Sequence, residues 1–210
     1  MARAAQLAVR SEGEALLEFP CPLEPITAIR STLITSSLAS LRLRDLLPRY
    51  EAAQQSPHRE TILRCVAGEW LPLEVGFAHY RACDALGLSP DEQVAIGKDV
   101  SRRIHDTFLS TVAKMARGAG VTPWLLLAKG NTLQSRLYRG GGMRIVRLAA
   151  KSARVELARH GLLELPYYRN AVQGVYTAGV ELLGSNVSCR ILRAESSDPG
   201  RLLVLRIDWE

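Results

Sequence analysis

Residues 143–158 read MRIVRLAAKSARVELA, and the pattern of this stretch decides the fold. Upstream, apolar residues recur every three or four positions, whereas here Ile145, and later Val155 and Leu157, alternate with charged neighbours. Alternation with a period of two is typical of a β-strand that buries one face. We therefore expect two strands here, joined by a short connection at 149–152.

The residues that follow predict one helix and two more strands. Pro166 opens a segment with apolar residues at helical spacing, and Gly184 ends it. Alternating residues at 187–191 and 203–209 then flank the turn sequence Asp198-Pro199-Gly200, which favours a β-hairpin. The order strand, strand, helix, strand, strand indicates an antiparallel sheet rather than alternating βαβ units.

Most of the chain before residue 143 has helical periodicity. A helix is expected from about residue 26 until Pro48 stops or kinks it, and another over 73–86. A third begins at Ser89-Pro90-Asp91-Glu92, where Ser supplies an N-cap, Pro the first helical position and Glu a capping box. The apolar residues on its buried face are Ile96, Val100, Ile104, Phe108, Val112 and Met115. This spacing predicts a helix of about 28 residues that ends at Gly118 and Gly120.

A last helix is expected from Pro123 to the Gly140-Gly141-Gly142 run, with Gly130 as a weak interior point. Together these elements predict a single α+β domain over 1–210, in which an N-terminal helical layer packs on a C-terminal antiparallel sheet. Residues 1–22 would form an N-terminal hairpin or arm, 23–140 the helical part and 143–210 the sheet-forming part.

Composition places the chain among globular proteins. Of its 210 residues, 47% are hydrophobic and 23% charged, which supports a packed core. The four cysteines form no CxxC pair, so neither a zinc ribbon nor a disulfide framework is indicated. No apolar run approaches the ~20 residues of a membrane span, and we expect a cytoplasmic protein without a membrane-spanning segment.

The positive charge is concentrated in one segment. The net charge is +6, and residues 139–159 alone contribute +5. Arg144, Arg147, Lys151 and Arg154 in the two predicted strands form a candidate anion or nucleic-acid site. That segment lacks aromatic residues, which single-strand binders interleave with their cations. Nucleic-acid binding is therefore the alternative hypothesis, beside a contact with an acidic partner or a solvated sheet edge.

Nothing in the sequence indicates catalysis or a metal centre. His79 and Cys83 share one helical face, but two ligands do not make a metal site, so core packing is the simpler interpretation. His105 on the third helix could face a pocket, but a lone histidine in such a stripe is more often a surface or satisfied core residue than an axial haem ligand. No GxSxG elbow or phosphate loop is present. We expect no enzyme activity, no catalytic residues, no metal and no cofactor.

Three stretches carry a resemblance to known families. They are ITAIRSTLITSSL, GEWLPLEVGFAHYRACDALG and the closing GVYTAGVELLGSNVSCRIL with LLVLRIDW. Over about residues 24–209 the chain resembles a large paralogous family of myxobacterial proteins that has no assigned activity. The closing helix and hairpin are also similar to the superfamily of vinyl-4-reductase ligand domains, haem nitric-oxide-binding domains and TRAPP vesicle-tethering subunits.

The second resemblance implies helices on an antiparallel sheet, a hydrophobic or porphyrin-like ligand between the layers, and dimerisation. The sequence departs from the signatures of particular members. Tyr167-Tyr168-Arg169-Asn170-Ala171 does not reproduce the Tyr-x-Ser-x-Arg of the nitric-oxide sensors, and Cys189 is the single cysteine where the vinyl-reductase type has several. This departure weakens the haem and metal interpretations.

The sequence thus predicts a non-enzymatic regulatory or sensory module that binds a small apolar ligand or a partner protein. We expect it to form a homodimer or to contact another protein. Large rings would dominate an apolar cavity between the layers, so they are the candidate ligand-binding residues: Phe77, Tyr80, Phe108, Trp124, Tyr168 and Tyr176.

Overall fold

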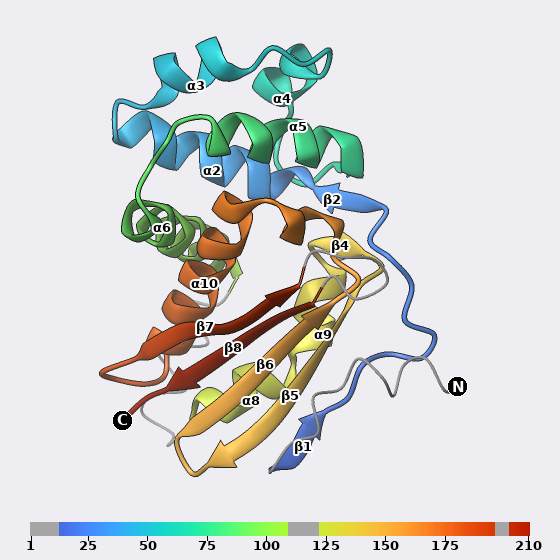
Figure 1. Ribbon diagram of the computed structural model, residues 1–210, viewed down its shortest axis with the longest axis vertical. Helices are drawn as coiled ribbons and strands as arrows, with labels where there is room; N and C mark the ends of the chain where they lie inside the picture. Colours follow the sequence, from blue (N-terminus) through green and yellow to red (C-terminus); the bar gives the residue numbers. More distant parts are fainter. Residues whose placement is uncertain (1–12, 109–121, 196–201) are drawn as a thin grey trace.

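Five strands form an antiparallel sheet in the order β1-β5-β6-β8-β7 (Figure 1). The computed structural model describes residues 13–108, 122–195 and 202–210, without the side chains of 105–108 and 195. The strands are β1 (Glu14–Leu17), β5 (Gly142–Ala149), β6 (Ser152–Ala158), β7 (Ser188–Glu195) and β8 (Leu202–Asp208). A short 3-10 turn, η1 (Gly161–Glu164), and the helix α10 (Pro166–Glu181) connect β6 to β7. The predicted α+β class and its strand, strand, helix, strand, strand order are confirmed.

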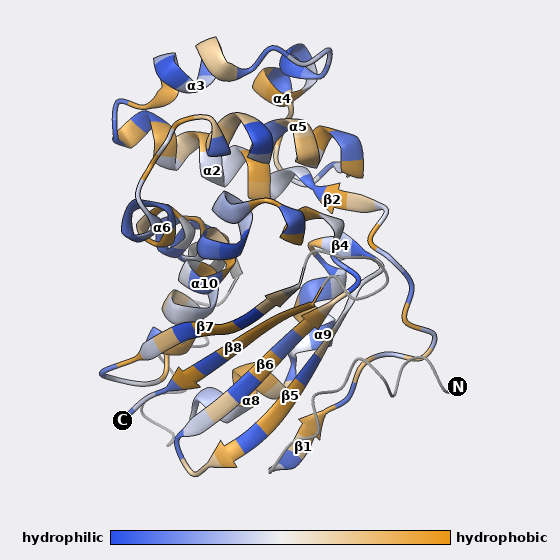
Figure 2. Ribbon diagram, viewed as in Figure 1, coloured by the Kyte–Doolittle hydropathy of each residue, from blue (hydrophilic) through white to orange (hydrophobic). Residues whose placement is uncertain are grey.

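The two faces of the sheet differ in chemistry, as the alternation predicted. Ile145, Val155 and Leu205 lie side by side across β5, β6 and β8, and all three are fully buried on the helix-covered face. On the opposite face Glu156 lies beside Arg144 of β5. Figure 2 shows this alternation of apolar and polar residues along β5 and β6. One apolar cluster runs from the helix-covered face through the helices above it.

The helices in the upper half of Figure 1 pack on one another and on α10, which contacts β7 and β8 of the sheet. Those before residue 109 are α2 (Ser31–Leu43), α3 (Leu47–Ala53), α4 (Arg59–Arg64), α5 (Leu73–Asp84) and α6 (Pro90–Phe108). The predicted capping box starts α6: Glu92 accepts hydrogen bonds from the backbone N–H and the hydroxyl of Ser89, at 2.7 and 2.8 Å. The remainder of the long predicted helix, with Val112 and Met115, lies outside the described residues.

Two glycines let α6 and α10 cross in close contact. A Cβ atom at Gly97 would lie 2.0 Å from the carbonyl oxygen of Ala171, and one at Gly174 would lie 2.1 Å from the carbonyl oxygen of Val94. Real Cβ atoms do not come this close to backbone oxygen atoms, so only glycine fits at either position. The crossing fixes the distance between α10 and the rest of the helical layer.

A second, three-stranded sheet departs from the expectation that 23–140 is helical. It has the order β3-β2-β4 and consists of β2 (Ala28–Arg30), β3 (Trp70–Pro72) and β4 (Tyr138–Arg139). These strands of two or three residues are too short to give a periodic signal. The predicted helix from residue 26 therefore starts only at Ser31, and Pro48 lies in the first turn of the next helix instead of ending this one.

The helix expected over 123–140 is also divided. It forms α8 (Pro123–Ala128) and α9 (Gly130–Ser135), and the chain then enters β4. The glycine run after it is closely packed rather than flexible. Gly140 and Gly141 have positive φ angles, and the Gly141 N–H donates to the carbonyl of Glu24 at 2.7 Å.

The N-terminal hairpin is only partly within the described chain. The first strand of this hairpin, before residue 13, lies outside the described residues. Its second strand is β1, which pairs with β5. The turn expected at 198–200 also lies outside the described residues. Within the described ranges, no helix combines the length and the apolar character needed to traverse a bilayer.

Candidate functional site

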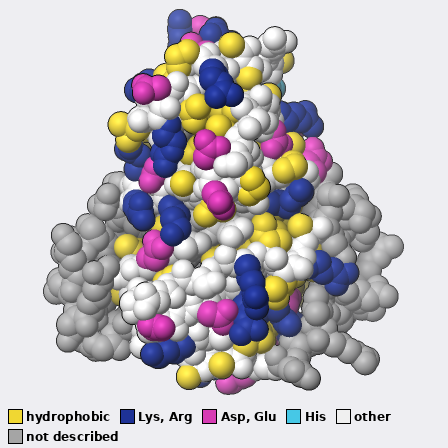
Figure 3. All heavy atoms as spheres, turned by 60° about the vertical axis from the view of Figure 1, so that its left-hand side comes forward, with side chains coloured by type: hydrophobic (Ala, Val, Ile, Leu, Met, Phe, Trp, Pro, Cys, Tyr) yellow, Lys and Arg dark blue, Asp and Glu magenta, His cyan; other side chains and the backbone are white. Residues whose placement is uncertain are grey.

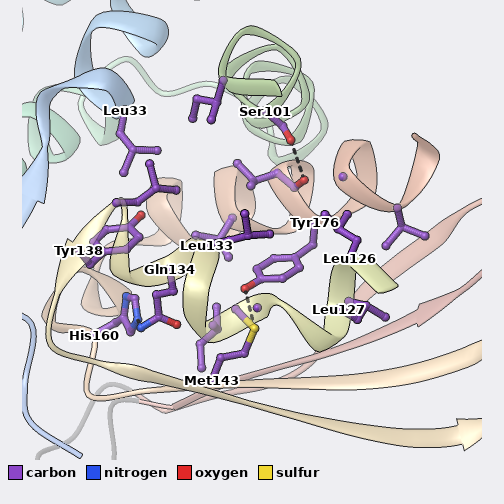
Figure 4. Close-up of a pocket in the computed structure, with 18 of the residues that line it drawn as sticks. Leu33, Ser101, Leu126, Leu127, Leu133, Gln134, Tyr138, Met143, His160 and Tyr176 are labelled. Carbon is purple, nitrogen blue, oxygen red and sulfur yellow. Dashed lines mark hydrogen bonds between the residues drawn. The ribbon is translucent and has the colours of Figure 1, made fainter. Parts of the chain in front are cut away.

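A cavity of about 130 Å³ lies between the helices and the inner face of the sheet. Figure 4 shows side chains from α10, α8, α9 and β5 converging on it. Most of the lining is aliphatic or aromatic, including Tyr168 and Tyr176 of α10, Leu127 and Leu133 of α8 and α9, Met143 of β5 and Leu157 of β6.

The sequence builds the walls of this cavity through helical spacing and one close approach. In α10, which starts at Pro166, every fourth residue from Tyr168 to Val180 faces the cavity. The helix α9 approaches β5 closely at its first residue. A Cβ atom at Gly130 would lie 2.2 Å from the Met143 sulfur.

Tyrosine hydroxyls along the cavity are paired with one another or with sulfur. Tyr168 donates to the hydroxyl oxygen of Tyr138 at 2.7 Å, and the Tyr176 hydroxyl lies 3.7 Å from the Met143 sulfur. Burial raises the pKa of Tyr138 to about 12 and raises the pKa of Tyr176 further. The phenols are therefore neutral at physiological pH, and they supply no phenolate for catalysis.

One end of the cavity is polar. The Gln134 side-chain nitrogen lies 3.0 Å from the His160 Nε2 atom, and both side chains are buried, 7% and 2% exposed. Burial lowers the pKa of His160 to about 4, so its ring is neutral. The Gln134 Oε1 and His160 Nδ1 atoms have no hydrogen-bond partner among the described residues.

The predicted ligand-binding rings fall into different places. Tyr168 and Tyr176 line the cavity, and Tyr80 packs edge-on against Tyr168 beside a smaller adjoining hollow of about 30 Å³. Phe77 does not line either space; it lies on α5, where Arg81 stacks on its ring at 5.1 Å. The side chain of Phe108 lies outside the described part of the chain, as does that of His105.

Trp124 also faces away from the cavity. Its ring packs edge-on against Trp209 at 4.8 Å, and its N–H donates to the Ala150 carbonyl at 2.8 Å. The guanidinium of Arg147 lies 4.6 Å from the ring centroid. Trp124 therefore links α8 to the turn between β5 and β6 through this hydrogen bond.

Sequence reasoning missed Gln134, His160 and Met143 as cavity residues. Gln134 and His160 are 26 positions apart and belong to no motif, so only the folded structure shows that they are in contact. Met143 lies in the predicted alternating strand, but alternation alone does not show that β5 meets α9; the close contact at Gly130 is seen only in the structure.

The four predicted anion-binding residues do not form one basic surface. Arg144 and Arg154 both pair with Glu156, with N–O distances of 3.6 and 2.8 Å. Arg147 stacks on Trp124, and Lys151 is exposed in the turn after β5. The excess of positive charge in this segment is thus partly neutralised inside the fold.

Acidic and basic side chains are also interspersed elsewhere on the surface. Figure 3 shows both signs side by side on the face that it presents. Lys98 of α6 pairs with Glu181 of α10 at 2.6 Å, and Arg44 of α2 pairs with Asp99. This mixture gives little support to a nucleic-acid interface, which requires a continuous basic surface.

Glu156 is expected to stabilise the fold by balancing two arginines. Its carboxylate is fully buried, and Glu156→Gln leaves Arg144 and Arg154 without their shared counter-charge. We expect the free energy of unfolding to fall by about 2 kcal/mol, measured by urea denaturation. In the control, Glu60→Gln removes an exposed ion pair with Arg64 and is expected to cost less than about 0.5 kcal/mol. Equal losses in the two variants would contradict this account.

His79 and Cys83 are both buried in the helical layer. The His79 Nδ1 atom lies 2.7 Å from the Tyr50 hydroxyl, and its Nε2 atom lies 3.8 Å from the Cys83 sulfur. Gln54 donates to the same Tyr50 oxygen at 3.2 Å. Within the described ranges, no group of three or more His, Cys, Asp or Glu side chains is placed to hold a metal ion.

The fold of this chain, with helices packed on an antiparallel sheet, is similar to that of solved H-NOX domains. An H-NOX protein from K. algicida in the Fe(II) unliganded state matches with a TM-score of 0.62 at 12% identity, covering 87% of this chain and 97% of that chain. An H-NOX variant from T. tengcongensis gives 0.60 at 11% identity, covering 87% and 98%. An oxygen-binding H-NOX domain related to soluble guanylate cyclases gives 0.57 at 11% identity, covering 87% and 95%.

These likenesses establish the fold, and they agree with the predicted likeness to haem nitric-oxide-binding domains. No family model matches the chain, and no curated protein matches its sequence. The resemblance to the myxobacterial family therefore stays a prediction.

Haem is the subject of two other solved structures with this fold, one of them from the H-NOX family, but the described residues of this chain do not fit it. A volume of about 130 Å³ is well below the 300 Å³ or more of pockets for drug-sized ligands. The inward side chains of β6 are Val155 and Leu157, so this strand offers no cation for a porphyrin carboxylate. The His160 Nε2 atom is occupied by Gln134.

Proposed function

We propose that the protein is a non-enzymatic sensory or regulatory module that binds a small apolar molecule directly in the cavity between α10 and the sheet. The observation that carries this proposal is the cavity itself. At about 24 cal/mol per Å³, leaving a space of 130 Å³ unfilled would cost the fold roughly 3 kcal/mol. A ligand that fills this space recovers part of that free energy, so binding stabilises the protein.

The size and chemistry of the cavity support a compact ligand. Apolar cavities of about 150 Å³ in proteins stay dry and bind benzene or xenon, and this cavity is of similar volume. The oxygen-binding domain among the structural neighbours shows that one protein with this fold holds a small ligand. In this proposal the module acts in the cytoplasm. Ligand binding in the cavity changes its contact with a second copy or with another protein.

The alternative role in nucleic-acid binding receives no support from the described geometry, because Arg144 and Arg154 are directed to Glu156.

Benzene binding tests the proposal. We expect benzene to shift the methyl NMR signals of Leu127 and Leu157 and to raise the melting temperature. Leu157→Trp places an indole ring in the cavity and is expected to weaken both effects, whereas Leu125→Trp, at an exposed position of α8 that does not line the cavity, preserves them. The proposal fails if benzene leaves the signals and the melting temperature of the unaltered protein unchanged. Native mass spectrometry and absorbance of the purified protein show whether a ligand co-purifies.

The cavity also predicts that the same substitution, Leu to Phe, changes stability by different amounts at two paired positions. Leu157 and Leu203 are direct partners on β6 and β8, but Leu157 alone of the two lines the cavity. Leu157→Phe has room and is expected to change the free energy of unfolding by less than about 1 kcal/mol, whereas Leu203→Phe overpacks a filled region and costs about 1–3 kcal/mol. Urea denaturation of the two variants measures the difference. Similar losses at both positions would show that the cavity closes in solution.

A further inference from the structure

The polar end of the cavity restricts the chemistry of its ligand. Most of the rest of the lining is aliphatic or aromatic, and here the amide of Gln134 and the imidazole of His160 meet (Figure 4). In the close-up, the Gln134 oxygen points away from His160 and into the cavity.

The orientation of the Gln134 amide follows from its neighbours. Its nitrogen lies 3.0 Å from the His160 Nε2 atom and 3.5 Å from the Gly140 carbonyl oxygen. If the amide were reversed, its oxygen would face that carbonyl oxygen, and two acceptors would oppose each other. The nitrogen therefore points toward His160 and Gly140, and Oε1 is the atom left for the cavity.

The protonation of His160 is consistent with this orientation. A neutral imidazole has one donor nitrogen and one acceptor nitrogen. Because Nε2 accepts from Gln134, the proton is on Nδ1, and His160 holds the amide with its oxygen turned inward. His160 is thus a positioning residue for Gln134.

The inward oxygen has no partner among the described residues although Gln134 is 93% buried, which follows from its 7% exposure. A buried amide oxygen without a hydrogen bond is unfavourable, and a donor placed opposite it removes that penalty. A charged donor is disfavoured, because none of the described lining residues carries a carboxylate and an unpaired buried charge is far more costly.

We infer that the natural ligand is an uncharged molecule with a compact apolar body of about six heavy atoms and one O–H or N–H group, which donates to Gln134 Oε1. This inference rests on the proposed function, because it names the chemical class that the same cavity selects. A purely apolar molecule would fill the space but leave the oxygen unpaired. A molecule with only an acceptor would place two oxygens against each other.

Three probes of equal size test the inference: cyclopentanol, cyclopentanone and methylcyclopentane. The first carries a donor, the second only an acceptor, and the third neither. Binding is measured by NMR titration of three proteins: the unaltered protein, Gln134→Met and Gln173→Met. The Gln134→Met substitution keeps the length of the side chain but removes the oxygen. Gln173 lies on α10, donates to the Cys189 carbonyl and does not line the cavity, so it is the matched control.

We expect Gln134→Met to weaken cyclopentanol binding about tenfold, the usual effect of leaving one buried polar group unpaired. The same variant is expected to bind methylcyclopentane with unchanged or higher affinity. In the unaltered protein cyclopentanone is expected to bind more weakly than cyclopentanol, and in Gln134→Met this difference is expected to disappear. Gln173→Met is expected to change none of these affinities.

The outcomes separate this inference from the proposed function. If methylcyclopentane binds but Gln134→Met affects all three probes equally, the donor requirement is wrong and the apolar cavity stands. If none of the probes binds the unaltered protein, both fail. If Gln134→Met unfolds, Gln134→Glu is the second variant. Below its pKa this side chain is a neutral carboxylic acid whose carbonyl oxygen still accepts a hydrogen bond, so cyclopentanol binding is expected to be retained there. A loss of binding at every pH would overturn the inference.

Discussion

Gly174→Ala is expected to lower the free energy of unfolding by about 3 kcal/mol or more. The new methyl group would lie 2.1 Å from the Val94 carbonyl oxygen and 3.0 Å from the Gly97 Cα atom. Neither atom belongs to a side chain that can rotate away, so the two helices have to separate. Gly97→Ala meets the backbone of Ala171 in the same way and is expected to have a similar effect.

The matched control is Gly76→Ala on α5. A Cβ atom there would lie 3.3 Å from a methyl group of Ile29, which is a side chain that can adjust. The gain in helix propensity, up to about 1 kcal/mol, offsets this contact. Urea denaturation is expected to place Gly76→Ala within about 1 kcal/mol of the unaltered protein. A loss at Gly174 no larger than at Gly76 would show that the helices do not cross so closely.

The second large effect is a loss of stability in mild acid. Burial lowers the pKa of His79 to about 3 and that of His160 to about 4, whereas an unfolded chain protonates histidine near 6.5. Between these values the unfolded state binds more protons than the native state. Stability is therefore complete above pH 6.5 and falls as the pH decreases, by about 1.4 kcal/mol per pH unit for each histidine. The decline continues to about pH 4 for His160 and about pH 3 for His79.

Other groups titrate in the same range, so the comparison must be between variants. Burial raises the pKa of Asp84, and this carboxyl group acts in the opposite direction as the pH falls. We expect His79→Gln and His160→Gln each to remove about 1.4 kcal/mol per pH unit from the slope between pH 4.5 and 6. Leu125→Phe, which keeps both histidines, is expected to keep the full slope. Urea denaturation at a series of pH values measures all four proteins.

Long amphipathic elements were predictable from sequence because their signal accumulates over many residues. The start of α6 follows from a capping box, and the sheet follows from an alternation that continues through β5 and β6. The strands β2, β3 and β4 gave no such signal, since two or three residues cannot establish a period. Their existence depends on pairing between segments that are far apart in the sequence.

The candidate site was predictable only where a long helix fixes the direction of side chains. Tyr168 and Tyr176 lie on the apolar stripe of α10, and both line the cavity. Trp124 belongs to a helix of six residues, too short for its apolar face to be assigned, and its ring packs on Trp209 instead. The pair formed by Gln134 and His160 could not be found from sequence, because neither residue type indicates a cavity on its own.

The position of β8 has a consequence for how this chain folds during synthesis. It is the last strand along the described chain, yet it lies between β6 and β7 and hydrogen-bonds to both. Until the ribosome has released residue 208, the hairpin of β5 and β6 has an open edge next to apolar side chains such as Val155 and Leu157, and such edges favour aggregation. The helices can assemble earlier, but the sheet closes in one late step.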